Sequence, residues 1–214
     1  MKAFSSHSLP LPIEFVEGFE FYTIVMMRHP LLRVRSVYDF ELRQPENTPG
    51  SIHAKKLSFC EYVEWRMRSD VGTTIRNMHV RYLTANSLPR VEKLTDKYYE
   101  SALNFIQNNR LTGIVELFDQ SAVVFDDYLA SNEINIDFAY KVQNQSSRAN
   151  ISQEKQLNDL KDDLGGSVYE LLLANNELDL RLYEEAKKIV VERYRNLPGS
   201  EVGLDSLRKK CNEL

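Results

Sequence analysis

Cysteine is scarce in this sequence, and its scarcity excludes two kinds of stabilised scaffold. Only Cys60 and Cys211 are cysteines among the 214 residues. They lie far apart in the chain and have no metal-ligand spacing, so we expect neither a disulfide framework nor a structural zinc site. The four histidines include no i,i+4 pair, and no metal is expected. This cysteine usage suits a reducing compartment, and we therefore expect a cytoplasmic protein.

Long apolar runs and an excess of positive charge are also missing. No segment approaches the roughly 20 apolar residues that span a bilayer, and the first fifteen residues hold no run typical of a signal peptide. A net charge of −4 argues against general nucleic-acid binding. We interpret residues 1–214 as a single domain with a real core. Its last residues, 200–214, are expected to form either a short helix or a loose tail.

Two short apolar segments predict strands, and most of the remaining sequence predicts helices. FYTIVMM, residues 21–27, is too short for a buried helix and rich in strand-forming residues. A second strand is expected within 111–118. Pro30 suits a first helical turn that continues to residue 43, whereas the polar stretch 44–54 predicts a loop. The other expected helices cover 57–69, 75–85, 92–109, a stretch ending near 129, and a long final helix ended by Pro198-Gly199. This order predicts an α/β domain with a parallel sheet flanked by helices.

An arginine at a strand end, followed by a helix serine, predicts an anion-binding site. Arg28 directly follows the strand 21–27, at the C-terminal end where open α/β sheets bind ligands. The helix beginning near Pro30 directs its N-terminal amides to the same place. Ser36 lies about 140° around that helix from its apolar stripe, so burial does not explain it. A guanidinium and a hydroxyl so placed can grip a phosphate. The plainer alternative is a surface arginine and an exposed serine.

Residues 28–38, RHPLLRVRSVY, resemble the R-x-P-x-x-R-x-x-S-x-Y signature of sulfotransferases that use 3′-phosphoadenylyl sulfate (PAPS). His29 stands where that family often has Asp. Three more segments resemble the family in its order: 76–83 is similar to N-x-Q-T-R-x-L, 111–125 to VGLTERFDESL, and 171–186 to N-x-L-D-x-x-L-Y-x-x-A. The heparan sulfate 2-O-sulfotransferases are the most similar type. The resemblance implies a P-loop NTPase-like sulfotransferase fold and transfer of a sulfuryl group from PAPS to a carbohydrate-type hydroxyl.

The resemblance also implies a role for particular residues. Arg28 and Ser36 take the positions that bind the 3′-phosphate of PAPS or of its product, adenosine 3′,5′-bisphosphate. Arg148 falls in the loop 140–152, which corresponds to a basic loop that closes over the nucleotide; a solvated polar loop is the alternative. Arg81 matches an arginine of the second segment and is expected near the cofactor or the acceptor.

His7 is the residue that the resemblance implies as the catalytic base. A neutral imidazole can accept the proton of the acceptor hydroxyl as that hydroxyl attacks sulfur. The tripeptide Ser6-His7-Ser8 resembles the family's G-H-x segment, which carries such a histidine. The alternative interpretation is a loop histidine near a frayed terminus.

One part of the family pattern has no counterpart in this sequence. The loop that cradles the 5′-phosphosulfate contains glycine and a lysine, yet no G-x-x-x-x-G-K run occurs and only six residues precede His7. We therefore expect an N-terminally truncated or degenerate homologue that is inactive as this chain. The alternative is a catalytically dead nucleotide-binding or protein-interaction module. A missing neighbour strand would leave 21–27 as an open sheet edge, which predicts self-association as a homodimer.

Overall fold

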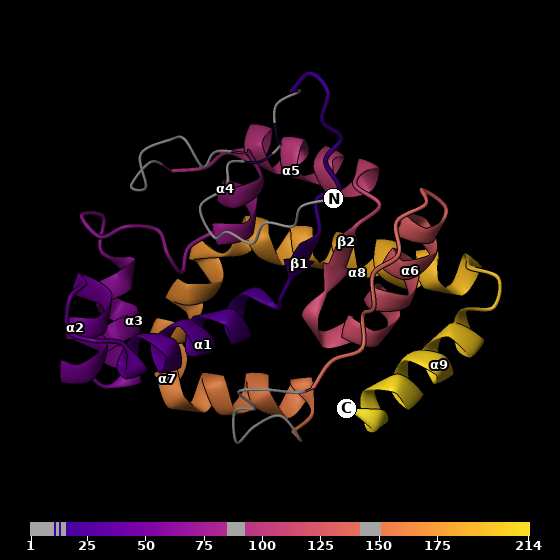
Figure 1. Cartoon of the computed structure of the whole chain (residues 1–214). Helices are drawn as coiled ribbons and strands as arrows, with labels where there is room; N and C mark the ends of the chain where they lie inside the picture. Colours follow the sequence, from indigo (N-terminus) through magenta and orange to yellow (C-terminus); the bar gives the residue numbers. More distant parts are fainter. Residues whose placement is uncertain (1–10, 12, 14–15, 85–92, 142–150) are drawn as a thin grey trace.

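The computed structural model describes residues 11, 13, 16–84, 93–141 and 151–214, which form a helix-rich fold around a small parallel sheet (Figure 1). Strand β1 (Val25–Met27) pairs with β2 (Thr112–Ile114), and the register runs from Val25 opposite Thr112 to Met27 opposite Ile114. The helices are α1 (Pro30–Arg43), α2 (Pro49–Lys56), α3 (Phe59–Met67), α4 (Met78–Thr84), α5 (Asp96–Asn108), α6 (Phe118–Ala130), α7 (Gln153–Asn175), α8 (Glu177–Asn196) and α9 (Ser200–Glu213), with a 3-10 turn η1 (Val115–Leu117) after β2. The expected parallel sheet with flanking helices is thus confirmed in this reduced form.

The first strand is shorter than the sequence predicts. Only Val25–Met27 of the segment 21–27 is a strand, while Phe21 and Ile24 are 45% and 44% exposed. The partner strand sets this length: β2 begins only at Thr112, because helix α5 extends to Asn108 and a turn follows it, so residues 21–24 have no strand to pair with among the described residues.

The prediction of a loop at 44–54 is wrong from residue 49 onward. Helix α2 begins there because Thr48 and Ser51 form a reciprocal capping box and Pro49 occupies the first turn. Helix α1, by contrast, begins and ends where the sequence predicts.

The sheet lies between two groups of helices that form separate cores. Helices α4, α5 and α8 cover the strands through Val80, Ile106, Leu182 and other buried residues. Helix α6 packs closely on β2 because Gly113 has no side chain; a Cβ there would lie 2.6 Å from the Phe125 ring. Figure 1 shows α1, α2, α3 and α7 grouped on one side of the strands, and α6 and α9 on the other.

The second core joins α1, α3 and α7. Leu31, Val34 and Tyr38 form the buried stripe of α1, as the spacing predicts, although Leu42 at its end is 36% exposed. Helix α7 bends at Gly165, which has a φ of 70°. Helix α9 buries Leu204 and Leu207 in a third core with α6, so most of the stretch 200–214 is a packed helix.

Candidate functional site

The parallel register brings the chain out of both strands at the same edge of the sheet. Arg28 follows Met27, and Glu116 follows Ile114 by two residues. Their side chains meet there, with Arg28 Nε 4.0 Å from Glu116 Oε1. Arg28 Nη1 donates a 2.6 Å hydrogen bond to Ser36 Oγ, one and a half helical turns into α1. Arg28 and Ser36 thus contact each other beyond the end of β1, and their shared role in binding an anion stays a prediction.

The Arg28 guanidinium keeps donor capacity that the described residues do not use. Its Nε is buried and has no hydrogen-bond partner in the described part of the chain, while the side chain as a whole is 35% exposed. Helix α1 begins beside it without a side-chain cap and without an acidic residue in its first turn. A helix N-terminus of this kind favours an anion. The arrangement can therefore bind a small anionic group such as a phosphate.

Glu116 is held in place by two donors from distant parts of the chain. Its Oε1 accepts the backbone N–H of His29 at 3.1 Å, and its Oε2 accepts the Tyr183 hydroxyl at 3.1 Å. Burial, with the Glu116 carboxylate beside it, raises the pKa of Tyr183, so that hydroxyl stays protonated. The carboxylate thus links β2, α1 and α8 behind Arg28.

His29 is a neutral, buried part of this cluster. It is 7% exposed, and its ring meets the Tyr183 ring edge-on at a centroid distance of 5.1 Å. Burial lowers the pKa of His29 to about 4, and the nearby Lys187 and His79 act in the same direction. The imidazole is therefore uncharged at neutral pH, and it adds packing rather than positive charge to the site.

The start of helix α4 is joined to helix α8 by hydrogen bonds next to this cluster. The Asp179 carboxylate on α8 accepts the backbone N–H groups of His79 and Val80 at 2.8 and 2.9 Å, which caps the start of α4. In return, Asn77 Oδ1 accepts the Asp179 N–H at 3.0 Å. His79 Nδ1 also lies 3.1 Å from Asp179, but it has no hydrogen bond among the described residues, so the pair is a close contact and no more. Arg33 joins α1 to this region by donating to Thr74 O at 2.8 Å.

The remaining residues expected at the site have different outcomes. Arg81 is a buried residue of α4, with 7% of its surface exposed. Burial lowers the pKa of Arg76, and the positive charge of the nearby Arg81 lowers it further. His7 and Arg148 lie outside the described residues. The sequence reasoning missed Glu116 and Tyr183. Glu116 was detectable, because it follows the second strand at the edge that drew attention to Arg28.

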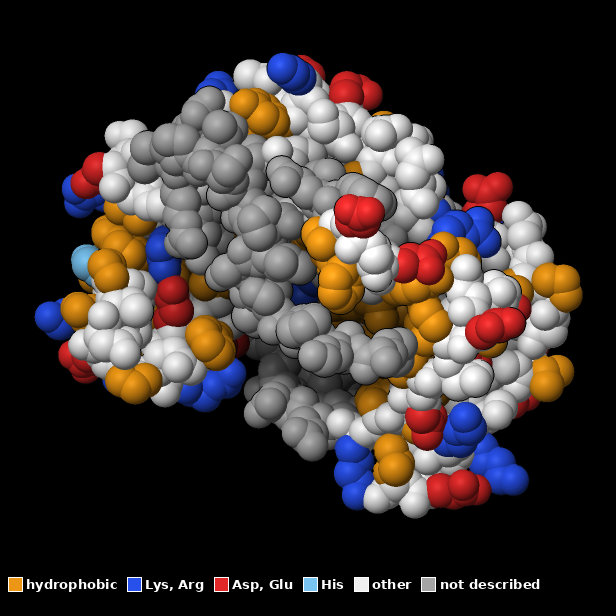
Figure 2. Space-filling view, turned by 45° about the horizontal axis from the view of Figure 1, so that its top comes forward, with side chains coloured by type: hydrophobic (Ala, Val, Ile, Leu, Met, Phe, Trp, Pro, Cys, Tyr) orange, Lys and Arg blue, Asp and Glu red, His pale blue; other side chains and the backbone are white. Residues whose placement is uncertain are grey.

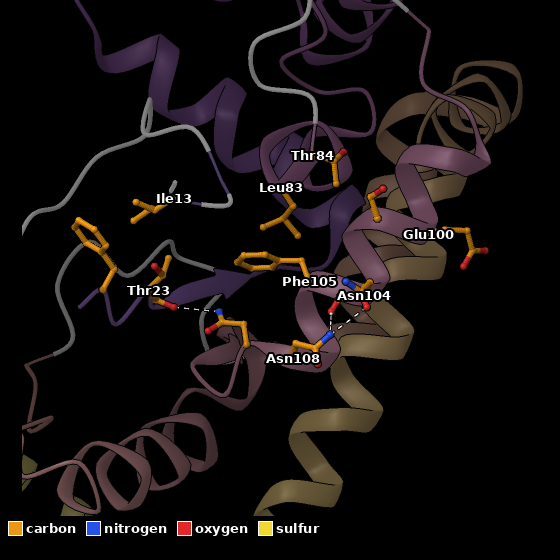
Figure 3. A pocket seen from close by; sticks show the side chains of 11 residues that line it. Ile13, Thr23, Leu83, Thr84, Glu100, Asn104, Phe105 and Asn108 are labelled. Atoms are coloured by element: carbon orange, nitrogen blue, oxygen red, sulfur yellow. Dashed lines mark hydrogen bonds between the residues drawn. The ribbon is translucent and has the colours of Figure 1, made fainter. Parts of the chain in front are cut away.

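A wide pocket lies away from the Arg28 cluster, beyond the opposite end of β1. It encloses about 880 Å³ between that end of the strand, α4 and α5, with Leu83 and Phe105 in its wall (Figure 3). Two of its asparagines use their amide donors within the wall: Asn109 Nδ2 donates to Thr23 O, and Asn108 Nδ2 to Asn104. On the face seen in Figure 2, hydrophobic side chains gather around a hollow, and acidic and basic side chains are interspersed around them. We assign no chemistry to this pocket.

Neither a metal centre nor a membrane-spanning helix is found in the part of the chain that the structure describes. No group of three or more His, Cys, Asp or Glu side chains in the described ranges could hold a metal ion. Within the same ranges, no helix has the length and apolar character needed to cross a membrane.

Comparison with known proteins gives one relative. The chain is 27% identical over 200 residues to an uncharacterized protein of Archaeoglobus fulgidus, a match that covers 90% of this chain and 76% of that protein. No family model and no solved structure matches the chain.

Proposed function

We propose that this chain is a sulfotransferase-like domain that binds the 3′-phosphate of PAPS, or of adenosine 3′,5′-bisphosphate, with Arg28 and Ser36. The observation that carries the proposal is the 2.6 Å contact between Arg28 Nη1 and Ser36 Oγ at the C-terminal edge of the sheet. A strand-end arginine and a helix hydroxyl beside the N-terminus of α1 together suit a doubly charged phosphate.

The surroundings of Arg28 fit such a ligand. The guanidinium is partly exposed and retains a buried Nε without a hydrogen-bond partner among the described residues. The nearby carboxylate of Glu116 does not use up the guanidinium, because its Oε1 lies 4.0 Å from Arg28 Nε, beyond hydrogen-bond distance. A phosphate can therefore bind the exposed part of the guanidinium, whereas the buried Nε is out of its reach.

The four segments that resemble sulfotransferases also converge in space, which supports the proposal. Arg28 and Ser36 come from the first, Asn77 from the second, Glu116 from the third and Asp179 from the fourth. Direct hydrogen bonds or ion pairs join the first segment to the third and the second to the fourth. A P-loop NTPase-like sulfotransferase fold, with its site at this sheet edge, is the corresponding structural proposal.

In the proposed reaction, the oxygen of a carbohydrate-type hydroxyl bonds to the sulfur of PAPS as the bond from sulfur to the 5′-phosphate oxygen breaks. Adenosine 3′,5′-bisphosphate is the leaving group, and the hydroxyl proton passes to the base. Arg28 and Ser36 orient the nucleotide by its 3′-phosphate and take no part in bond making. His7 as the base and Arg148 as a lid contact belong to the proposal, as does Arg81 near the cofactor or acceptor.

A second candidate function is nucleotide binding without transfer. The sequence contains no G-x-x-x-x-G-K run to hold the 5′-phosphosulfate, and removing one donor aimed at a transition state commonly costs about 2.7–4 kcal/mol. Binding of the bisphosphate without sulfuryl transfer to any hydroxyl acceptor would favour this candidate. Association as a homodimer also stays part of the proposal, supported by the exposed Phe19, Phe21 and Ile24 before β1.

Calorimetric titration with two nucleotides tests the proposed site. Adenosine 3′,5′-bisphosphate should bind more tightly than adenosine 5′-monophosphate, which lacks only the 3′-phosphate. Arg28→Ala should abolish that preference and Ser36→Ala should reduce it, because charge-assisted hydrogen bonds to the phosphate are lost. Arg43→Ala is the matched control, since Arg43 lies exposed in the last turn of the same helix. Equal affinity for both nucleotides, or a preference that survives Arg28→Ala, would contradict the proposal.

A further inference from the structure

Glu116 and Tyr183 form a fixed pair behind Arg28, and nothing in the resemblance assigns a role to either. The pair is built from η1 and α8, and the two residues are 67 positions apart in the sequence. The Tyr183 hydroxyl donates to Glu116 Oε2, and the His29 backbone N–H donates to Oε1. With both oxygens engaged by donors on different elements, the carboxylate has one orientation.

The fixed carboxylate lies on one side of the Arg28 guanidinium, and Ser36 lies on the other. Glu116 Oε1 is 4.0 Å from Nε, while Ser36 Oγ is 2.6 Å from Nη1. An arginine side chain loses rotamer entropy when it binds a ligand. Contacts at both ends of the guanidinium restrict its plane before a ligand arrives, which lowers that cost.

We propose that Glu116 and Tyr183 are positioning residues that hold Arg28 in the orientation that binds a phosphate. The inference rests on the proposed function of Arg28. Tyr183 acts through Glu116, and Glu116 acts through the guanidinium; neither contacts the ligand. The separation of 4.0 Å matters, because a carboxylate in a bidentate pair would saturate Arg28 and exclude the phosphate.

Removal of the Glu116 charge has two opposite effects, so Tyr183→Phe is the cleaner test. Loss of the carboxylate both loosens Arg28 and removes a competitor for it. Tyr183→Phe retains the carboxylate and the ring that meets His29, and it deletes only the hydroxyl that orients Glu116. Tyr194→Phe is a matched control, because Tyr194 lies on the same helix and its hydroxyl donates to Glu201 at 3.0 Å.

The readout is the ratio of the Kd values for adenosine 5′-monophosphate and adenosine 3′,5′-bisphosphate. In Tyr183→Phe this ratio should fall roughly three- to tenfold, the range of one hydrogen bond, with the monophosphate affinity unchanged. Tyr194→Phe should leave the ratio at the wild-type value. In an Arg28→Ala background, Tyr183→Phe should have no further effect, because the positioned group is gone.

Each other outcome overturns the inference in a distinct way. An equal loss of affinity for both nucleotides means that Tyr183 is only structural, and an unchanged ratio means that Arg28 does not depend on it. If Tyr183→Phe does not fold, Glu116→Gln replaces it: its effect on the ratio, of either sign, must disappear in the Arg28→Ala background. A wild-type chain without preference for the bisphosphate overturns the proposed function as well, whereas a wild-type preference with a silent Tyr183→Phe overturns the positioning role alone.

Discussion

Arg28 and Arg66 are both in contact with residues of helix α1, but their surroundings differ. Arg66 donates from Nε to the Tyr62 hydroxyl at 2.8 Å, from Nη1 to Thr74 Oγ1 at 3.3 Å and from Nη2 to Glu41 Oε1 at 2.5 Å. Its side chain is 8% exposed, against 35% for Arg28. The comparison separates a saturated arginine, whose three nitrogens each donate a hydrogen bond within the protein, from one whose guanidinium is partly exposed to a ligand.

The Arg66 cluster is closed to any ligand by close packing. The Tyr62 hydroxyl also donates to Glu41, and burial raises the pKa of Tyr62, so it remains a donor. The backbone of α2 approaches so closely that a Cβ on Gly50 would overlap the Glu41 carboxylate and the Arg66 guanidinium. No equivalent approach is found at Arg28 within the described residues.

Loss of Arg66 should destabilise the fold more than a change at His29 or at Arg28. Arg66→Ala leaves the Glu41 carboxylate buried without its cation, which typically costs about 3–5 kcal/mol. The free energy of unfolding, measured in urea, should fall by that amount. Arg68→Ala is the matched control: Arg68 is 61% exposed and pairs only with Asp70 among the described residues, so its loss should cost less than about 1 kcal/mol. Similar losses for the two variants would mean that the Arg66 cluster is not a structural anchor.

His29 should produce the second largest effect, as a dependence of stability on pH. Its pKa is about 4 in the fold, below the ordinary value of 6.5. Between these values the unfolded chain binds a proton that the folded chain does not, so stability falls as the pH falls from about 6.5 to about 4. The loss amounts to about 3 kcal/mol in all.

The control for this pH dependence is His29→Phe, which retains a ring against Tyr183 and cannot titrate. The difference in unfolding free energy between this variant and the wild type should change across the window from pH 6.5 to 4. Parallel stability curves over that window would show that His29 accepts a proton in the fold as readily as in the unfolded chain.

The sequence predicts the features around Arg28 that depend only on neighbouring residues in the chain. Helix α1 follows from Pro30 and the stripe from Leu31 to Tyr38, and the strand-end rule places Arg28 beside that helix. The meeting of Arg28 with Ser36 needs only eight residues of chain. These features could be predicted because each is decided by neighbours within one strand and one helix.

The rest could not be predicted, because it depends on partners from distant parts of the chain. The donors that fix Glu116 lie 67 and 87 positions away. The acceptor that pairs with Arg66 is Glu41, 25 positions away on another helix, so the sequence offers no sign that Arg66 is saturated and Arg28 is not. The length of β1 was overestimated for the same reason, since β2 decides where pairing stops.

Arg28→Ala should have the smallest effect on stability and thereby sharpen the comparison. The variant removes one hydrogen bond and the ion pair to Glu116, which at 4.0 Å is much longer than the 2.5 Å pair of Arg66 with Glu41. Ser36 is partly exposed and can bond to water, so the expected cost is about 1 kcal/mol. Glu116 keeps both of its other donors, His29 and Tyr183.

The same unfolding experiment with adenosine 3′,5′-bisphosphate then distinguishes the two arginines. At a ligand concentration about 100 times Kd, the wild type should gain about 2.7 kcal/mol. Arg66→Ala, where it still folds, should keep most of that gain despite its low stability, whereas Arg28→Ala should lose it while remaining nearly as stable as the wild type. A gain that follows Arg66 in place of Arg28 would reverse the assignment of the two arginines, because the saturated one would then be the ligand's partner.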